Sequence, residues 1–217
     1  MGNQKNISMI MGVILAVSFS FIILFIEPLF PGVLRYGYLK KLMIWIWLLI
    51  IFLYSVKVEK QKFLLWKDKK ESLRFYIISI IAIVGLSFLA GGTQFLLPKF
   101  GLKLESSQVL KEMVAYLHLH PVLLVFTSAT AAFVEELIFR GYLIPRLKML
   151  LKRGYIAVIL SALIFGFAHI GYGTLINMYV PFLIGIIFGA YYQKYRNLKV
   201  LIFSHFIIDL LSLLTAK

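Results

Sequence analysis

Residues 121–144 read PVLLVFTSATAAFVEELIFRGYLI, and this stretch decides the class of fold. It is apolar for most of its length, and about 20 helical residues suffice to cross the hydrocarbon core of a bilayer. Its charged residues Glu135, Glu136 and Arg140 are of a kind that is rare in such helices and usually faces the interior of a bundle. The stretch therefore predicts a transmembrane helix with polar groups buried among its neighbours.

The composition of the whole chain agrees with a membrane protein. Of its 217 residues, 61% are apolar and 15% are charged, against about 45–50% and about 25% in soluble domains. The mean hydropathy is +0.92. Because so little polar surface cannot cover a water-facing globule, a soluble domain is excluded. Cysteine is absent, which also excludes disulfide frameworks and Cys-ligated metal sites.

Further apolar runs predict the remaining spans. We expect an all-α fold, a polytopic membrane helix bundle of about seven (seven or eight) transmembrane helices, in a single domain over residues 1–217. The first run is too long for the core of a signal peptide and is expected to remain as a span. The further runs are 7–26, 42–56, 75–97, 155–170, 175–192 and 198–214.

Lysine and arginine are distributed unevenly between the two sides that seven spans define. The side of the N-terminus has 15 of them and the other side has 7, while Arg140 lies within a span. The positive-inside rule therefore predicts a cytoplasmic N-terminus and an external C-terminus. This asymmetry accounts for most of the net charge of +14, so we expect no nucleic-acid partner. The basic residues 57–74 are interpreted as a topogenic signal, with a helix on the cytoplasmic leaflet as the alternative.

The two adjacent carboxylates of the fourth span are expected to play different parts. A charged group at the centre of a transmembrane helix costs roughly 2.5–3.5 kcal/mol, so buried charges need partners. Glu136 and Arg140 are four residues apart with the acid first, the order that favours an ion pair on a helix. Glu135 points about 100° away around the helix and has no such partner. It is the better candidate for a carboxylate that takes part in chemistry.

Two later spans add imidazoles at a similar depth. Phe165 and His169 are one turn apart in the fifth span, and His205 and Asp209 are one turn apart in the last. At 1.5 Å of rise per residue, Glu135 and both histidines lie within about 6 Å of the membrane midplane. A carboxylate beside an imidazole can deprotonate water, and a second imidazole can stabilise an oxyanion. The cluster thus indicates hydrolysis by an activated water molecule.

Other chemistries have less support in the sequence. Covalent catalysis lacks both a cysteine and a G-x-S-x-G nucleophile elbow. We expect no cofactor. A zinc ion held by Glu135, His169 and His205 stays open as an alternative, although no H-E-x-x-H motif is present.

The three stretches EELIFR (135–140), FGFAH (165–169) and HFIID (205–209) resemble the motifs of a known family. In order and spacing they are similar to those of the CAAX-protease and bacteriocin-processing (Abi-type, CPBP) family of intramembrane glutamic endopeptidases. The resemblance covers residues 121–215, which we expect to form the catalytic helix bundle, and the first hundred residues carry no motif.

The resemblance implies a role for each matched residue. Glu135 would be the catalytic base that activates water with the assistance of His169, and His205 would polarise the scissile carbonyl together with Asp209. The residues implied to support them are Glu136, Arg140 and Phe165.

Asp209 departs from the CAAX-prenyl endopeptidases, which carry Asn at this position. An ionised Asp cannot donate a hydrogen bond to an oxyanion. The alternatives are that Asp209 orients His205, is protonated, or helps to bind a metal.

The resemblance implies a metal-independent intramembrane endopeptidase of the bacterial plasma membrane, surrounded by membrane lipid, that cuts a hydrophobic or lipid-modified peptide or protein. One alternative is a non-catalytic bacteriocin-immunity or partner-binding protein in which the buried polar cluster is a scaffold. Another is a proton-coupled transporter, which the lack of a duplicated half disfavours.

Outside the motifs, Gly185 and Gly189 form a G-x-x-x-G that predicts close helix packing. Residues 109–117 predict an amphipathic helix at the outer interface.

Overall fold

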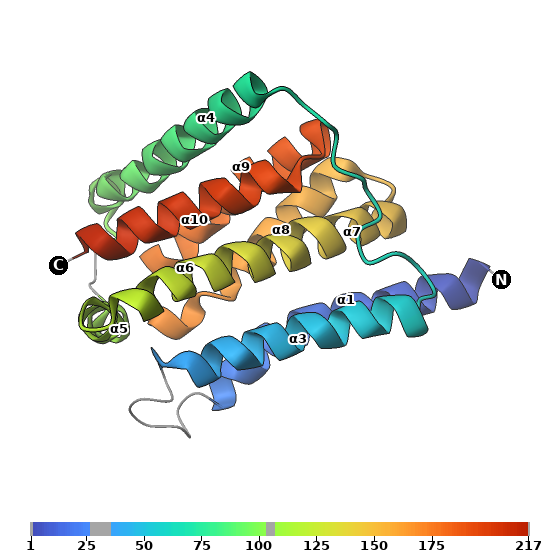
Figure 1. The fold of residues 1–217 in the computed structure, drawn as a ribbon, viewed down its shortest axis with the longest axis horizontal. Helices are drawn as coiled ribbons and strands as arrows, with labels where there is room; N and C mark the ends of the chain where they lie inside the picture. The colour runs from blue at the N-terminus through green and yellow to red at the C-terminus, as the bar shows by residue number, and fades with distance from the viewer. Residues whose placement is uncertain (1, 27–35, 103–106, 217) are drawn as a thin grey trace.

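The computed structural model describes residues 2–26, 36–102 and 107–216, and every regular element in these ranges is helical. Short 3₁₀ helices lie at Thr93–Phe100 and Ile170–Tyr172. A π-helical stretch at Glu136–Leu143, called the π segment below, joins α6 to α7. The α-helices, labelled as in Figure 1, are α1 (Gly2–Ile26), α3 (Tyr38–Lys57), α4 (Leu73–Gly92), α5 (Gln108–His118), α6 (Pro121–Glu135), α7 (Ile144–Leu151), α8 (Gly154–Phe167), α9 (Ile176–Tyr195) and α10 (Leu198–Thr215).

Six helices among the described residues are long and apolar enough to cross a membrane. They correspond to the last six of the seven expected spans. The first expected span lies in α1, where Gln4–Ser18 forms a shorter apolar helix. The prediction of an all-α, polytopic membrane bundle is confirmed.

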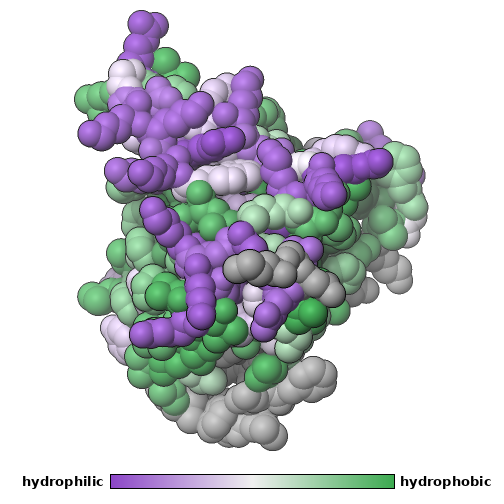
Figure 2. All heavy atoms as spheres, turned by 90° about the vertical axis from the view of Figure 1, so that its right-hand side faces the viewer, coloured by the Kyte–Doolittle hydropathy of each residue, from purple (hydrophilic) through white to green (hydrophobic). Residues whose placement is uncertain are grey.

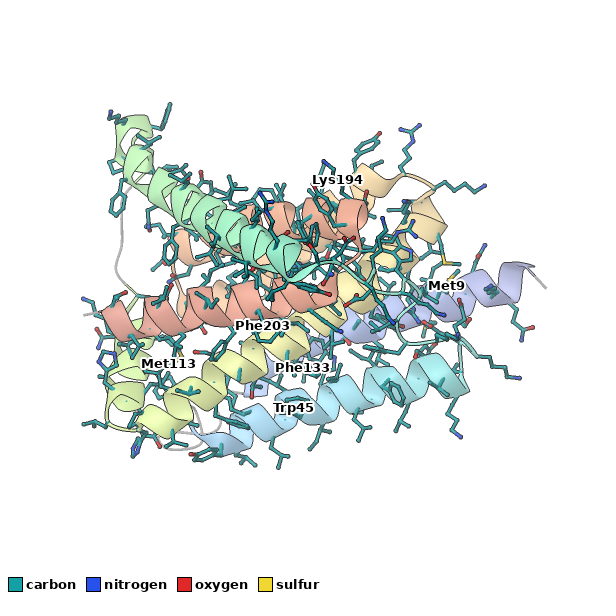
Figure 3. The ribbon with its side chains drawn as sticks, turned by 45° about the horizontal axis from the view of Figure 1, so that its top comes forward. Met9, Trp45, Met113, Phe133, Lys194 and Phe203 are labelled. Carbon is teal, nitrogen blue, oxygen red and sulfur yellow. The ribbon has the colours of Figure 1, made fainter. Side chains whose placement is uncertain are left out.

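Helix α6 lies in the middle of the bundle (Figure 1). It packs against α10 on one side and α3 on the other, α4 lies against α10, and α1 lies against α3. Side chains from α3 and α6 meet near Trp45 and Phe133, which are labelled in Figure 3. Their rings stack with centroids 5.4 Å apart, and Nε1 of Trp45 donates a hydrogen bond of 3.2 Å to Oγ1 of Thr130. The helix that carries the acidic pair is thus packed on both sides.

Helices α8 and α9 approach one another closely at two glycines. A Cβ atom at Gly185 would lie 2.9 Å from Cα of Ala162, and one at Gly189 would lie 2.9 Å from Cγ1 of Val158. Real side chains almost never come so near, so only glycine fits at this crossing. The close packing predicted from the G-x-x-x-G pattern is confirmed. The amphipathic helix predicted at 109–117 also forms, as α5, and it buries Met113, Val114 and Leu117.

The basic connections of the chain gather at one end of the bundle. The N-terminus, the segment between α3 and α4, and the α7–α8 and α9–α10 turns lie together at the right of Figure 1. Figure 2 faces this end and shows hydrophilic side chains over much of it. The C-terminus lies at the opposite end. The charge asymmetry therefore coincides with the two ends of the bundle, and which end is cytoplasmic stays a prediction.

The segment between α3 and α4, residues 58–72, is called the strap below, and it contains no helix. The alternative of a helix lying on the leaflet is therefore wrong. The backbone of the strap is hydrogen-bonded to other elements: the carbonyls of Lys62 and Phe63 accept from Arg146, and the N–H of Lys69 donates to the carbonyl of Arg196. Because these groups are satisfied elsewhere, they are not available for a helical ladder.

The fourth span is longer than expected, since it continues through the π segment and α7 to Leu151 instead of ending at residue 144. Pro145 stands in the first turn of α7, where a missing N–H is tolerated, and the π segment ends two residues before it. Arg146, which the sequence assigned to a basic loop, is consequently inside the helix and completely buried.

Candidate active site

Three packed helices place the predicted residues at the centre of the bundle. Glu135 ends α6, Glu136 begins the π segment, Phe165 lies in the last turn of α8, and His205 lies on α10. Helix α10 packs along α6 and the π segment, and α8 packs against the π segment as well. The packing therefore brings side chains from all three sequence motifs into one cluster.

Glu136 is completely buried and binds two partners through one oxygen. Its Oε1 accepts a hydrogen bond of 2.7 Å from Nη1 of Arg140 and lies 2.8 Å from Nδ1 of His205. The first contact is the predicted ion pair between residues four apart. The second joins the π segment to α10. Because a carboxylate paired with a guanidinium accepts hydrogen bonds, His205 presents its Nδ1 as an N–H to Glu136.

The other ring nitrogen of His205 faces two more carboxylates. Nε2 lies 3.5 Å from Oδ2 of Asp209 and 3.9 Å from Oε2 of Glu135. Asp209 is one turn later on α10, as its spacing predicted. His205 is thus held between Glu136 on one side and Asp209 and Glu135 on the other, which fixes the direction of the ring.

Phe165 forms an aromatic wall that three of the predicted side chains share. The guanidinium carbon of Arg140 lies 4.5 Å from the centre of its ring. The rings of His169 and His205 pack edge-on against it, with centroid distances of 4.9 and 6.2 Å. Phe188 on α9 adds a second ring 5.1 Å from Arg140. Cation–π contacts of desolvated arginines contribute about 2 kcal/mol, so these rings help to hold the buried cation.

His169 follows the last turn of α8 and is oriented by the backbone of that helix. Its Nδ1 lies 2.8 Å from the carbonyl oxygen of Phe165. A carbonyl oxygen can only accept, so Nδ1 carries the hydrogen and donates. Nε2 of His169 is therefore the nitrogen that can exchange a proton with another molecule.

A cavity of about 160 Å³ adjoins Glu135 and His169. Its walls come from α3, α5, α6, the π segment and the residues after α8. Much of the wall is apolar, including Ile44, Met113 and Phe139, and α3 also contributes Lys40 and Lys41. A cavity of about 150 Å³ is large enough to bind benzene. A small apolar group can therefore come next to both of these polar side chains.

Glu135 differs from Glu136 in exposure and in pairing. The side chain of Glu135 is 24% exposed, whereas that of Glu136 is fully buried. In the part of the chain that the structure describes, Oε2 of each acid is buried without a hydrogen-bond partner, whereas Oε1 of Glu136 is bound by Arg140 and His205. Of the two adjacent acids, Glu136 is therefore committed to the ion pair, and Glu135 is the one that is partly exposed and lines the cavity.

The predicted zinc ligands do not form a recognisable metal site. Within the described ranges, no group of three or more His, Asp and Glu side chains is arranged to hold a metal ion. Nδ1 of His169 and Nδ1 of His205 are already engaged by Phe165 and Glu136. The alternative of zinc held by Glu135, His169 and His205 stays a prediction for a metal-depletion experiment.

Glu59 of the strap and Arg146 of α7 form a second buried ion pair, which the sequence analysis missed. Oε2 of Glu59 lies 2.6 Å from Nη2 of Arg146, and both side chains are completely buried. Arg146 had been counted among the basic residues that follow the fourth expected span, and Glu59 lies in the stretch 57–74 that was interpreted as a topogenic signal. The available signal was a single acid between Lys57 and Lys60, at the end of a predicted span.

The family comparison covers the part of the chain that builds the cluster. A family model described as Type II CAAX prenyl endopeptidase Rce1-like matches residues 117–211. No match was found among curated proteins or solved structures. The matched residues run from the end of α5 into α10 and contain Glu135, His169 and His205.

Proposed function

Since residues 117–211 form a domain of the Rce1-like type II CAAX prenyl endopeptidase family, a family of proteases, we propose that this protein is a membrane-embedded endopeptidase in which Glu135 activates water. One observation carries the proposal. Glu135 lines a cavity that His169 also lines, and its Oε2, which lacks a hydrogen-bond partner among the described residues, lies 3.9 Å from Nε2 of His205.

The proposed reaction begins with a water molecule bound to Glu135. A water hydrogen-bonded to the partly exposed carboxylate of Glu135 would lie near His205 as well, because Oε2 of Glu135 is only 3.9 Å from Nε2 of His205. Glu135 takes one proton from this water while the oxygen attacks the carbonyl carbon of the scissile peptide bond. The bond to nitrogen then breaks, and the proton passes to the leaving amine from Glu135 or by way of Nε2 of His169.

In this proposal His205 and Asp209 stabilise the negative charge that develops on the oxygen of the scissile carbonyl. When Nε2 of His205 is protonated, it can donate a hydrogen bond to the oxyanion of the tetrahedral intermediate. Asp209, 3.5 Å from that nitrogen, stabilises the protonated imidazole by its negative charge and keeps the ring oriented. In this proposal Asp209 acts through His205 and does not itself donate to the oxyanion.

The substrate is proposed to be a membrane-associated peptide or protein that is hydrophobic or lipid-modified. The family implies peptide or protein substrates. The site lies among helices suited to cross a membrane, and the adjoining cavity has a largely apolar wall. The basic end of the bundle is proposed to face the cytoplasm, which places the N-terminus inside and the C-terminus outside.

Cleavage in a defined membrane tests the proposal. The purified protein is placed in liposomes with hydrophobic peptides, each with and without a lipid anchor, and products are identified by mass spectrometry. We expect cleavage by the wild type, no cleavage by Glu135→Ala, and unchanged cleavage by Glu71→Ala, whose side chain is exposed on the strap. Cleavage by Glu135→Ala at the wild-type rate would contradict the proposal.

A chelator in the same assay distinguishes metal-independent hydrolysis from hydrolysis that requires zinc. Hydrolysis by Glu135 and the histidines alone continues after metal depletion. Activity that is lost on chelation and restored by Zn²⁺ would favour the zinc site instead.

A further inference from the structure

The pair formed by Glu59 and Arg146 uses the full hydrogen-bonding capacity of the arginine. Nε of Arg146 lies 2.8 and 3.2 Å from the two oxygens of Glu59, and Nη2 lies 2.6 Å from Oε2. The remaining donors bind backbone carbonyls at Phe63, Tyr142 and Lys62, at 3.1 to 3.3 Å. All five N–H groups of the guanidinium are therefore satisfied without water. Such a pair, buried and complete, holds a defined geometry.

Tyr142 links this pair to the π segment. Its hydroxyl donates a hydrogen bond of 2.5 Å to Oε1 of Glu59, and the guanidinium of Arg146 stacks 3.6 Å above its ring. The ring of Phe63 stacks on Tyr142 as well, with centroids 5.6 Å apart. On α1, a Cβ atom at Gly12 would overlap the hydroxyl of Tyr142 and Oε1 of Glu59. The strap, α1 and the π segment thus meet at one carboxylate.

The strap also packs directly on the middle of the π segment. A Cβ atom at Gly141 would overlap Cδ2 of Leu64. From α8, Oγ of Ser161 donates a hydrogen bond of 3.2 Å to the carbonyl of Phe139. Both the strap and α8 therefore contact the π segment.

A π segment requires such support because its position along a helix is not fixed by its own hydrogen bonds. The i to i+5 hydrogen bonds can begin at one residue or at its neighbour. The starting residue determines how the side chains before the π segment are rotated around the helix axis relative to those after it. Glu135 and Glu136 stand at the start of this segment, and Tyr142 and Arg146 stand at and just beyond its end. An anchor at the far end therefore decides which way the two acids point.

We infer that Glu59 is a positioning residue for the active site: through Tyr142 and Arg146 it fixes the register of the π segment, and with it the aim of Glu135 and Glu136. This role rests on the proposed function, because it concerns the same carboxylates. Glu59 itself touches neither the cavity nor the cluster around His205. Its effect reaches the reaction only through the helix.

The first test is kinetic and uses Glu59→Gln, which keeps the shape of the side chain and removes its charge. We expect kcat to fall by about ten- to a hundredfold, the scale of a misplacement remote from the chemistry, with KM little changed. Tyr142→Phe, which deletes only the hydroxyl bound to Glu59, should change kcat in the same direction by less. Glu71→Gln, in the same strap but exposed, is the control and should behave as wild type. If Glu59→Gln does not fold, Tyr142→Phe carries the test.

A spectroscopic test detects a change in the contact between Glu136 and His205 without measuring activity. Nitrogen-15 resonances of the four histidines are recorded, and the signal of His205 is assigned by substituting it. We expect Glu59→Gln and Tyr142→Phe to shift the His205 signal, because its Nδ1 donates to Glu136. The signals of His118 and His120 should stay in place.

These experiments distinguish a failure of the proposed protease function from a failure of the positioning role of Glu59. If Glu135→Gln cleaves like wild type while Glu59→Gln shifts the His205 signal, the proposed function fails, and what stands is that Glu59 fixes the geometry of Glu136 and His205. If Glu135→Gln is inactive while Glu59→Gln keeps the wild-type kcat and an unshifted His205 signal, the positioning role alone is overturned.

Discussion

Nδ1 of His205 lies 2.8 Å from Oε1 of Glu136, the same oxygen that accepts a hydrogen bond from Arg140. One buried carboxylate thus joins a cation on its own helix to an imidazole on α10. The adjacent Glu135 does not join two such partners, its Oε2 lacks a hydrogen-bond partner among the described residues, and it borders the cavity. Two neighbouring acids in the sequence therefore have different environments, and the difference supports a structural part for Glu136 and a chemical part for Glu135.

Arg140→Met should destabilise the fold, because it leaves the charge of Glu136 buried without its cation. Removing one partner of a buried pair costs about 3–5 kcal/mol. The measurement is the free energy of unfolding in detergent. The double variant Glu136→Gln/Arg140→Met removes both charges and should recover most of the loss. A double variant that is less stable than Arg140→Met would contradict this reading of the pair.

Asp209→Asn should retain more activity than Asp209→Ala. The amide oxygen of Asn can still accept from Nε2 of His205, whereas Ala removes the acceptor. Loss of a hydrogen bond to a charged group costs about 1.5–3 kcal/mol, which corresponds to about a ten- to hundredfold lower kcat for Asp209→Ala. Initial cleavage rates under saturating substrate decide between the variants. Equal rates for Asn and Ala would show that Asp209 does not orient His205.

His169→Asn should fold normally and lose activity. An Asn side chain can keep a donor near the carbonyl of Phe165, where Nδ1 of His169 lies, but it does not extend to the position of Nε2. Loss of proton transfer lowers rates by about 10²–10⁴-fold. Cleavage assays together with unfolding temperatures measure both effects. Wild-type cleavage by His169→Asn would remove His169 from the mechanism.

Local patterns in the sequence predicted much of the fold and of the site. Run lengths located the spans, since the thickness of the bilayer fixes the length of a crossing helix. The spacing of Glu136 and Arg140 predicted their ion pair, and the G-x-x-x-G pattern predicted the crossing of α8 and α9. These features depend on neighbours along one helix or on the absence of a side chain. They do not require knowledge of how distant segments pack.

Features that depend on packing between distant segments were not predictable in the same way. The contact between Glu136 and His205 requires the register of α10 against the π segment. Glu59 and Arg146 are 87 residues apart, and each resembles an ordinary charge of a basic loop. The end of the fourth span was misplaced because the apolar run ends at residue 144, whereas the helix continues through the π segment into α7.

Gly185→Ala should weaken the packing of α8 on α9. The new methyl group would lie 2.9 Å from Cα of Ala162, a backbone atom that cannot move aside alone. Overpacking of this kind costs about 1–3 kcal/mol. Gly85→Ala on α4 is the matched control, because a Cβ atom there meets nothing within 4 Å. Replacement of a helical glycine by alanine in open space is favourable by roughly 0.5–1 kcal/mol. Unfolding temperatures that change in the same direction for both variants would contradict the prediction.

The cleavage rate of Glu135→Gln reports on whether Glu135 is the group that activates water. Glutamine keeps the size of the side chain and its hydrogen-bonding groups but cannot take a proton from water. With an unfolding temperature equal to that of the wild type, we predict a kcat at least about a hundredfold lower. A folded Glu135→Gln protein that cleaves the same peptide at the wild-type rate would show that Glu135 does not activate water.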